Sequence, residues 1–431
     1  MARRMKDSGI EWIGEIPEEW EISKVSYFYE VQLGKMLQPQ KKSETDTEEK
    51  YLCAANVGKN SLSLDTLKTM WFSQTEKHQF DLKEGDLLVV EGGDVASCAI
   101  IETPVRNLFF QNALHRVRPL HNESVAFLRY WLMTAKSYGY IDFICNKATI
   151  AHFSKEKFIA LPIPVIPQDI QSKIVSFLDL ECKQIDDLLS KSRSSIEEYK
   201  KLKQAVITQA VTKGVRGERE MKDSGVEWIG EIPVDWEISR IKYVSIFEPS
   251  CDFRKLTPET IITYSPMECI KNGTFERRTS LYGNLAHTLT PFQNGDIVMA
   301  KVTPCFENGN IAIMNELQSG YGLGSSELFV FRPQNINTRY LFYWLQNKLF
   351  VHQACATMTG TGGLKRISPS FVKNCNIHYP STAEQAQIAA YLDTKCAEID
   401  KLIAKKEQLV KELESYKKSL IYEVVTGKRE V

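Results

Sequence analysis

The most constraining feature of this chain is a twenty-residue segment that occurs twice. Residues 5–24 read MKDSGIEWIGEIPEEWEISK, and residues 221–240 read MKDSGVEWIGEIPVDWEISR. Sixteen of the twenty positions are identical, and the other four include Ile/Val, Glu/Asp and Lys/Arg exchanges. Chance cannot produce such a match, and the rest of the two halves differs greatly, which argues against an artificial copy. The chain is therefore an internal duplication whose halves share a fold.

A weaker correspondence runs through the bodies of the two halves. Gly85-Asp86 is answered by Gly295-Asp296, and Tyr130-Trp131-Leu132 is answered by Tyr343-Trp344-Leu345, in the same order and at an offset close to 213. We interpret both tryptophans as core residues rather than as base-stacking residues. The pattern predicts two bodies that share a fold and differ in most surface residues.

Each body is followed by a segment with a sustained heptad pattern of apolar residues. The pattern predicts long helices over residues 168–212 and 384–426, both preceded by prolines. Its register is the same in the two segments, as in the seam of a coiled coil. The predicted seam residues are Leu178, Ile185, Leu189, Ile196, Tyr199, Val206, Leu392, Ile399, Ile403, Val410, Leu413 and Leu420.

The repeat predicts an α+β fold in the order body, helix, body, helix. We divide it into a first mixed α/β body (1–165), a first helix (166–216), a second body (217–381) and a second helix (382–431). A pseudo-twofold relation between the halves would pair the two helices as an antiparallel coiled coil. A helix of about 45 residues would be about 68 Å long and would separate the bodies rigidly.

The composition is that of an ordinary globular protein. The 431 residues include 54 Lys and Arg and 54 Asp and Glu, so the net charge is zero. This balance argues against a strongly basic nucleic-acid coat protein but leaves room for local basic patches. The ten cysteines are scattered singly, which favours reduced thiols. The start MARRMKDSG has no apolar core, and no run of about 18 apolar residues occurs, so we expect a cytoplasmic protein without a membrane span.

The sequence shows none of the common motifs of nucleotide or metal chemistry. A methyltransferase catalytic motif, a phosphate-binding loop and metal-binding histidine pairs are all missing, and the glycine cluster at 359–365 lacks the required spacing. Asp86 with Glu91, and Asp296 with Lys301, are loose candidates for a magnesium nuclease. We prefer to interpret the two aspartates as turn caps, so we predict no catalytic residue and no metal site.

Polar and basic residues recur in loops at equivalent places in the two bodies. Glycines let a backbone approach a phosphate, Lys and Arg neutralise phosphates, and Asn, Gln and Arg can read base edges. Any single one of these residues could equally belong to an ordinary solvated loop. The prediction of DNA binding therefore depends on their recurrence at equivalent places in the two bodies. The candidate DNA-binding residues of the first body are Lys35, Gln38, Lys41, Gly92, Gly93, Asn112, Arg116, Lys147, Thr149, His152 and Lys155. Those of the second body are Lys271, Arg277, Arg278, Lys301, Thr303, Ser325, Ser326, Thr361, Gly362, Gly363, Lys365 and Arg366.

The duplicated leader and the two heptad helices resemble the specificity subunit of type I restriction–modification systems. The helices end in the similar sequences AVTKG (210–214) and VVTGK (424–428), and the second begins with the pattern Glu384-Gln385 followed by Ile388. The first helix departs slightly, with Ile170-Gln171 in place of Glu-Gln. The resemblance covers essentially the whole chain.

The resemblance implies that each body is a target-recognition domain that reads one half of a bipartite, asymmetric site in double-stranded DNA. It implies that the helices set the spacing and dock two methyltransferase subunits, and that restriction subunits join through these. The partners would bind S-adenosylmethionine, ATP and magnesium, while this chain would hold no cofactor and would be non-catalytic. The bases read and the spacer length do not follow from the sequence.

Two other hypotheses remain open. A coiled-coil scaffold that bridges proteins without nucleic acid predicts no base preference. A nuclease with a degenerate site built on Asp86 and Asp296 predicts magnesium-dependent cleavage by the isolated chain.

Overall fold

The chain folds into two compact units, and each unit contains one body and part of both long helices. The computed structural model describes residues 3–58, 61–145, 151–271, 273–286, 288–360 and 363–431. Unit 1 comprises Met1–Ser192 and Gln408–Val431, and unit 2 comprises Arg193–Glu407. Among the described residues, no helix has the length and apolar character that crossing a membrane requires.

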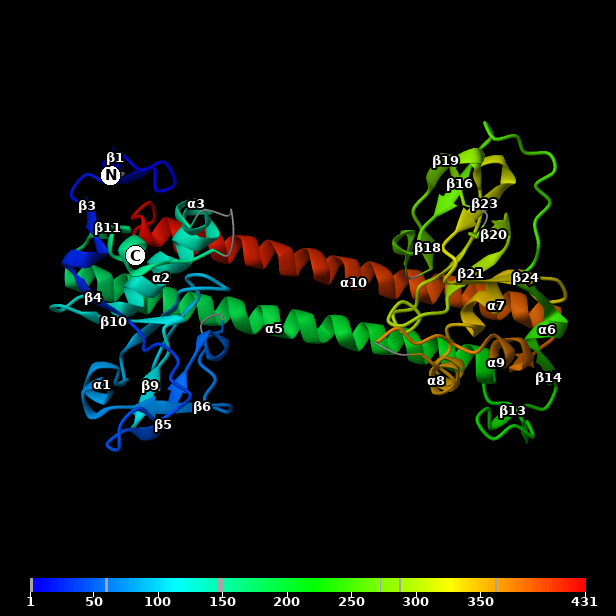
Figure 1. Ribbon diagram of the computed structural model, residues 1–431. Coiled ribbons are helices and arrows are strands. Elements are labelled where there is room, and N and C mark those ends of the chain that lie inside the picture. Colours follow the sequence, from blue (N-terminus) through cyan, green and yellow to red (C-terminus); the bar gives the residue numbers. More distant parts are fainter. Residues whose placement is uncertain (1–2, 59–60, 146–150, 272, 287, 361–362) are drawn as a thin grey trace. The chain divides into compact units, whose positions relative to one another are not determined.

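The two long helices are α5 (Gln168–Lys213) and α10 (Thr382–Val425), close to the predicted ranges. In unit 1 the first part of α5, with Leu178, packs in one core with the last part of α10, with Leu420. In unit 2 the last part of α5, with Ile207, packs with the first part of α10, with Leu392 (Figure 1). The helices are therefore antiparallel in each unit, as predicted.

The predicted seam residues are all at least partly buried. The buried seam residues are Leu178, Ile185, Leu189, Ile196, Leu392, Ile399 and Leu420. The half-buried ones are Tyr199, Val206, Ile403, Val410 and Leu413.

Two polar residues that interrupt the heptad pattern form ion pairs between the helices. Lys417 Nζ lies 2.6 Å from Asp186 Oδ1 in unit 1, and Lys203 Nζ lies 2.7 Å from Asp400 Oδ2 in unit 2. Adding 214 to the number of one lysine and one aspartate gives the other pair. The interruptions thus contribute the same cross-helix contact twice.

Near the N-terminus of each long helix, a glutamine side chain forms hydrogen bonds with the backbone of the neighbouring body. The Gln171 side chain accepts from Ser124 N (3.0 Å) and donates to Ile166 O (2.9 Å). Gln385 accepts from Asn337 N (2.8 Å) and donates to Pro380 O (2.9 Å). The glutamine of the Glu-Gln pattern therefore has this bonding role in both halves, including the half in which the glutamate is replaced.

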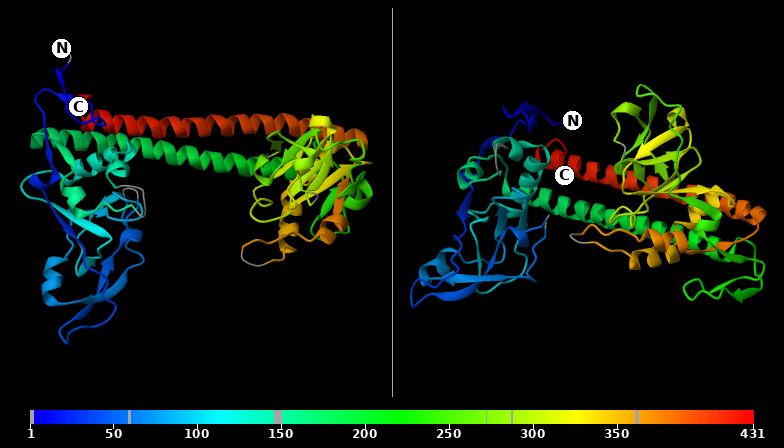
Figure 2. Two further views of the ribbon diagram at one scale, coloured as in Figure 1. Left: turned by 45° about the horizontal axis from the view of Figure 1, so that its top comes forward. Right: turned by 45° about the vertical axis from the view of Figure 1, so that its right-hand side comes forward.

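The body of unit 1 is built on a four-stranded antiparallel sheet in the order β4-β10-β7-β8. A second sheet, in the order β6-β5-β9, packs on one face, and Figure 2 shows it on the side of the central sheet away from α5. The strands are β1 (Met5–Asp7), β2 (Glu15–Pro17), β3 (Glu21–Lys24), β4 (Tyr29–Leu33), β5 (Thr47–Leu52), β6 (Lys68–Phe72), β7 (Leu87–Val90), β8 (Cys98–Ile100), β9 (Leu108–Phe110), β10 (Leu114–Pro119) and β11 (Pro162–Val165). The shorter helices are α1 (Gln74–Gln79), α2 (Val125–Ser137), α3 (Tyr140–Ile144) and α4 (Lys155–Ile159).

The body of unit 2 repeats the central sheet, in the order β15-β24-β21-β22. Its second sheet has the order β19-β16-β23-β20. The strands are β12 (Met221–Asp223), β13 (Glu231–Pro233), β14 (Glu237–Arg240), β15 (Ser245–Phe247), β16 (Ile261–Ser265), β17 (Ile270–Lys271), β18 (Thr274–Phe275), β19 (Arg278–Leu281), β20 (Thr290–Gln293), β21 (Ile297–Ala300), β22 (Ile311–Ile313), β23 (Tyr321–Gly324), β24 (Leu328–Pro333) and β25 (Asn376–Tyr379). The shorter helices are α6 (Ile241–Val244), α7 (Thr338–Trp344), α8 (Lys348–Ala356) and α9 (Pro369–Asn374).

The strands β7 and β21 are apolar throughout because both of their faces are covered. Side chains alternate between the faces of a strand. Leu87 and Val89 belong to the core that includes α2 and α5, whereas Leu88 and Val90 belong to the core of the second sheet. Trp131 and Trp344 are fully buried in the helix-side cores, which confirms their interpretation as core residues.

The turns that enter these two strands are held by buried aspartates. Asp86 Oδ2 accepts from Lys83 N (2.8 Å), and Asp296 Oδ2 accepts from Gln293 N (2.9 Å). The preceding residues Gly85 and Gly295 have φ of 86° and 87°, a region that favours glycine. The predicted role of the aspartates as turn caps is confirmed.

Candidate nucleic-acid interface

In unit 1, three loops that lie far apart in the sequence meet where β7 ends. Glu91 N donates to Ala113 O (2.9 Å), and Phe153 N donates to Glu91 O (2.7 Å). Gly92 and His152 form an antiparallel bridge. We call residues 91–93, 112–113 and 152–153 the strand-end junction of unit 1. It brings together the predicted residues Gly92, Gly93, Asn112 and His152.

Unit 2 builds the same junction where β21 ends. Lys301 N donates to Glu327 O (3.0 Å), Ile367 N donates to Lys301 O (2.9 Å), and Val302 forms an antiparallel bridge with Arg366. Each bond repeats one of unit 1 at offsets of 210 and 214. The strand-end junction of unit 2 comprises residues 301–303, 325–327 and 365–367, and it gathers the predicted residues Lys301, Thr303, Ser325, Ser326, Lys365 and Arg366.

The loop that carries Arg366 is fixed at both of its ends. Thr359 N donates to Arg366 O (3.0 Å), and Arg366 N donates to Thr359 O (2.8 Å). Thr303 Oγ1 donates to Gly363 O (2.9 Å) and accepts from Lys365 N (2.9 Å). Gly363 and Lys365 are exposed to solvent, beside backbone that these bonds hold in place.

The two junctions differ in their charged side chains. In unit 2 the Arg366 guanidinium is paired with the Glu327 carboxylate, and the hydrogen bond from Arg366 lowers the pKa of Glu327. In unit 1 His152 Nδ1 lies 3.2 Å from Glu91 Oε2. His152 and Arg366 stand at equivalent backbone positions and are 56% and 50% exposed. The side chains change while the backbone bonding is retained.

Beneath the junction of unit 1 lies a buried histidine. His115 Nε2 is 2.7 Å from Phe153 O, and the ring packs edge-on against Phe153 and Phe158. Burial lowers the pKa of His115, which favours the neutral ring. Lys155, another predicted DNA-binding residue, begins α4 next to this cluster and is half-buried.

Three predicted DNA-binding residues lie inside unit 1 instead. Lys35 is 6% exposed and bonds Gln38 Oε1 (2.9 Å) and the Glu76 carboxylate. Gln38 is also buried, and it donates to Asp46. Arg116 is buried and donates to Asp81 O (2.7 Å). These side chains stabilise the second sheet and its surroundings, so we leave them out of the candidate interface.

The remaining predicted residues lie outside the junctions. Lys41 is exposed near the Trp71 ring, with Nζ 5.8 Å from the ring centroid. Lys271 is exposed at the end of β17, Arg277 pairs with Glu316, and Arg278 pairs with Glu276. Lys147, Thr149, Thr361 and Gly362 lie outside the residues that the structure describes.

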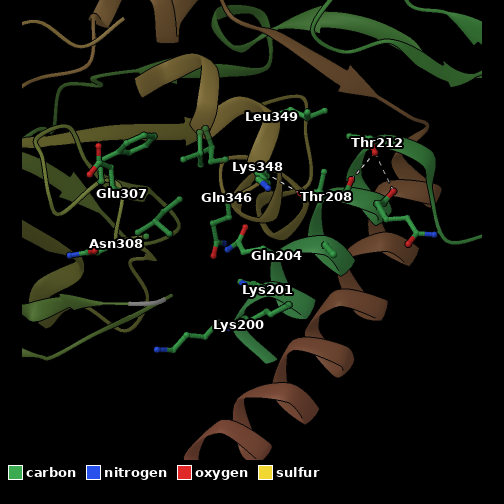
Figure 3. A pocket seen from close by; sticks show the side chains of 18 of the residues that line it. Lys200, Lys201, Gln204, Thr208, Thr212, Glu307, Asn308, Gln346, Lys348 and Leu349 are labelled. Carbon is green, nitrogen blue, oxygen red and sulfur yellow. Dashed lines mark hydrogen bonds between the residues drawn. The ribbon is translucent and has the colours of Figure 1, made fainter. Parts of the chain in front are cut away.

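Unit 2 also contains a cleft that the sequence did not reveal. It has a volume of about 1220 Å³ and lies between α5, the loop at 306–311 and the junction of α7 with α8. Figure 3 shows Lys200, Lys201 and Gln204 of α5 on one side and Glu307 and Asn308 on the other. In unit 1 the Tyr138 and Tyr422 rings stack at 4.3 Å between centroids, and offsets of 213 and 214 relate these positions to Val351 and Thr208, which line the cleft. No motif marks the cleft, because its lining comes from segments far apart in the sequence.

The described part of the chain offers no arrangement typical of metal chemistry. Within it, no group of three or more His, Cys, Asp and Glu side chains could hold a metal ion. The loose nuclease candidates Asp86 and Asp296 are buried and paired with Arg118 and Arg332. Both carboxylates therefore have structural partners.

The sequence matches one family twice. Residues 17–198 and 233–412 match the type I restriction modification DNA specificity domain. The chain is 32% identical over 163 residues to the specificity subunit of the type I restriction enzyme EcoEI of Escherichia coli, a match that covers 37% of this chain and 27% of the relative. It is 25% identical over 431 residues to the putative type I restriction enzyme MjaX specificity subunit of Methanocaldococcus jannaschii, covering 96% of this chain and 95% of the relative.

Solved structures share the fold at low sequence identity. A chain from a study of complex assembly and conformational transition of the type I R-M system has a TM-score of 0.71 and 13% identity, with 95% of this chain and 98% of that chain covered. The HsdS subunit from Thermoanaerobacter tengcongensis has a TM-score of 0.52 and 13% identity, with 96% and 98% covered.

Proposed function

Because the chain belongs to the family of the type I restriction modification DNA specificity domain, we propose that it is the non-catalytic subunit that reads DNA for a type I restriction–modification enzyme. Each body would read one half of a bipartite, asymmetric site in double-stranded DNA. The E. coli relatives match over only 27% of their own length, so activity and partners rest on the proposal.

The observation that carries the proposal is the pair of strand-end junctions. Two backbone hydrogen bonds, one of them within a β-bridge, are repeated in both units, while the side chains around them differ. In protein–DNA interfaces, phosphate contacts position the protein and side-chain contacts with base edges specify the sequence. A retained backbone with exchanged side chains is therefore the arrangement expected of two readers of different bases.

The long helices would hold the two readers at a set spacing and dock two methyltransferase subunits. Leu188 is 51% exposed and Leu402 is 42% exposed, at positions related by the offset of 214. Leu202 and Tyr416 form a second such pair, 48% and 46% exposed. Exposed apolar side chains that recur in this way support two copies of one partner, and restriction subunits would join through them.

We assign the cofactors to the partners. S-adenosylmethionine, ATP and magnesium would bind the methyltransferase and restriction subunits, in keeping with the missing motifs in this sequence. We expect the assembly in the cytoplasm. The target base would be flipped out of the helix by a partner while this chain holds the duplex.

A selection from random duplexes tests the proposal. The chain, co-expressed with its methyltransferase subunits, is expected to enrich a two-part asymmetric motif with a fixed gap. Binding of the selected site should fall as salt rises, because phosphate contacts release counterions. Non-specific binding without an enriched motif would reject sequence reading and favour the protein scaffold. Magnesium-dependent cleavage by the isolated chain would instead support the nuclease hypothesis.

A further inference from the structure

Arg366 uses only one edge of its guanidinium for its contact with Glu327. Nε lies 2.8 Å from Glu327 Oε2, and Nη2 lies 2.7 Å from Oε1. The guanidinium holds five N–H groups in a rigid planar fork. This side-on contact occupies Nε–H and one N–H of Nη2. The end of the fork, with parallel N–H groups on Nη1 and Nη2, remains for another acceptor pair.

A second arginine of unit 2 shows what a fully used fork looks like. Arg332 makes the same side-on contact with Asp296, with both bonds at 2.8 Å. Its Nη1 also donates to Ser250 O (3.1 Å), and its Nη2 contacts Cys251 Sγ (3.5 Å). Among the described residues, no acceptor is bonded to the fork end of Arg366. The N–H groups at the fork end of Arg332 therefore contact acceptors within the protein, whereas those of Arg366 are available to an outside acceptor pair.

Arg366 and Glu327 are both held by further hydrogen bonds within the protein, without any bound DNA. The backbone of Arg366 is bonded to Thr359 on both sides, and Glu327 N donates to Ser325 Oγ (3.2 Å). An arginine side chain normally loses much rotamer freedom on binding, and the Glu327 contact reduces that loss. The donor pair is thus both exposed and oriented.

We propose that Arg366 reads a guanine in the half-site bound by unit 2, with Glu327 as its positioning residue. The inference rests on the proposed function and narrows it to one base. Guanine presents two adjacent acceptors, O6 and N7, in the major groove, and these match the two donors of the fork end. Adenine places a donor beside N7, and cytosine presents a donor, so both lack the acceptor pair.

Unit 1 does not have this donor pair at the equivalent position. His152 stands there, with Nδ1 beside Glu91 and only Nε2 left for a base. One ring nitrogen makes one hydrogen bond, so it discriminates less sharply. The guanine contact through this position therefore belongs to unit 2 alone.

The test is the duplex selection repeated with variants of the full chain and its methyltransferase subunits. Arg366→Ala is expected to relax one G·C position in one half of the motif, by about 5- to 100-fold in relative affinity. Arg366→Gln is expected to shift that position toward adenine, since glutamine pairs with N6 and N7. Arg254→Gln is the matched control, because Arg254 makes the same side-on contact, with Asp252, outside the junction.

Glu327 is tested by discrimination at the same position. Glu327→Ala should weaken the guanine preference without changing its identity, and Glu327→Asp should restore part of it. An unchanged motif with Arg366→Ala, or relaxation at a position other than G·C, would overturn the inference while leaving the proposed function intact. Failure of the unmodified chain to enrich any motif would instead remove the proposed function.

Discussion

Units 1 and 2 share the part of the body that packs on the long helices and differ in the part that lies beyond it. Both have the same central sheet, and both place a parallel pair, β5 with β9 or β16 with β23, in the second sheet. Unit 2 adds β20 to that sheet, whereas unit 1 has α1 between β6 and β7. The difference indicates that packing against α5 and α10 restricts change, while the second sheet is free to vary.

The tyrosine stack of unit 1 and the cleft of unit 2 show a similar difference on a smaller scale. Tyr138 and Tyr422 stack in unit 1, whereas Val351 and Thr208, related to them by offsets of 213 and 214, line an open cleft in unit 2. Lys418 Nζ lies over the Tyr138 ring, 4.6 Å from its centroid. One duplicated frame therefore accommodates either a packed aromatic pair or an open cleft.

The largest effect is expected from the shared cores. Trp131→Ala and Trp344→Ala should each destabilise their own unit by about 3–5 kcal/mol, because both rings are fully buried. Denaturant unfolding followed by hydrogen exchange in each unit measures the effect. A variant that destabilises both units equally would contradict their separate cores.

The stability of unit 2 should depend on pH because His378 is buried there. The offset of 214 relates His378 to Pro164 of unit 1, which cannot titrate. Burial lowers the pKa of His378 to about 4, and its Nδ1 accepts from Trp344 Nε1 (3.0 Å). The unfolded chain, with an ordinary histidine pKa of about 6.5, binds the proton first as pH falls. The free energy of unfolding of unit 2 should therefore fall by up to about 3 kcal/mol as the pH is lowered from about 6.5 to about 4.

Stability profiles of His378→Gln check this contribution. The substitution keeps an acceptor for Trp344 and should flatten the profile of unit 2 over that range. Burial also lowers the pKa of His115 in unit 1, so the stability of unit 1 should fall with pH as well. The His378→Gln substitution should leave that pH dependence of unit 1 unchanged. An unchanged profile of unit 2 would refute the assignment to His378.

A smaller effect is expected when the aromatic stack of unit 1 is made to resemble unit 2. Tyr138→Val should lower the free energy of unfolding of unit 1 by about 1 kcal/mol, which is typical of the contribution that stacking of two aromatic rings makes in addition to their burial. A structure of the variant should show an opening beside α10. The reverse substitution, Val351→Tyr, should narrow the cleft of unit 2 and serves as the counterpart.

The smallest effect is expected from the paired lysines of the helices. Lys203→Ala and Lys417→Ala should each cost less than about 1 kcal/mol, because their aspartate partners are half exposed to solvent. The two costs should be equal within error and should shrink in high salt. Unequal costs would show that the pseudo-symmetry of the helices is geometric but not energetic.

The sequence predicts the elements that repeat better than the orientation of single side chains. The heptads of α5 and α10 and the buried Trp131 are periodic or duplicated features, so pattern alone locates them. Lys35 and Arg116 were predicted to contact DNA but are buried, since residue type does not tell which face of a loop turns inward. The cleft is lined by residues of α5, α10, the loop at 306–311 and the junction of α7 with α8, and no local sequence pattern tells that such distant segments meet.

The division of the chain between the units also has a consequence for synthesis. Unit 2 is one continuous stretch, whereas unit 1 needs residues from both ends of the sequence. Lys428 Nζ donates to Ile13 O (2.7 Å), and Leu420 and Val424 complete the core that contains Trp20. During synthesis, the core of unit 1 can therefore be completed only after the end of α10 has been made, whereas all residues of unit 2 are present once Glu407 has been added.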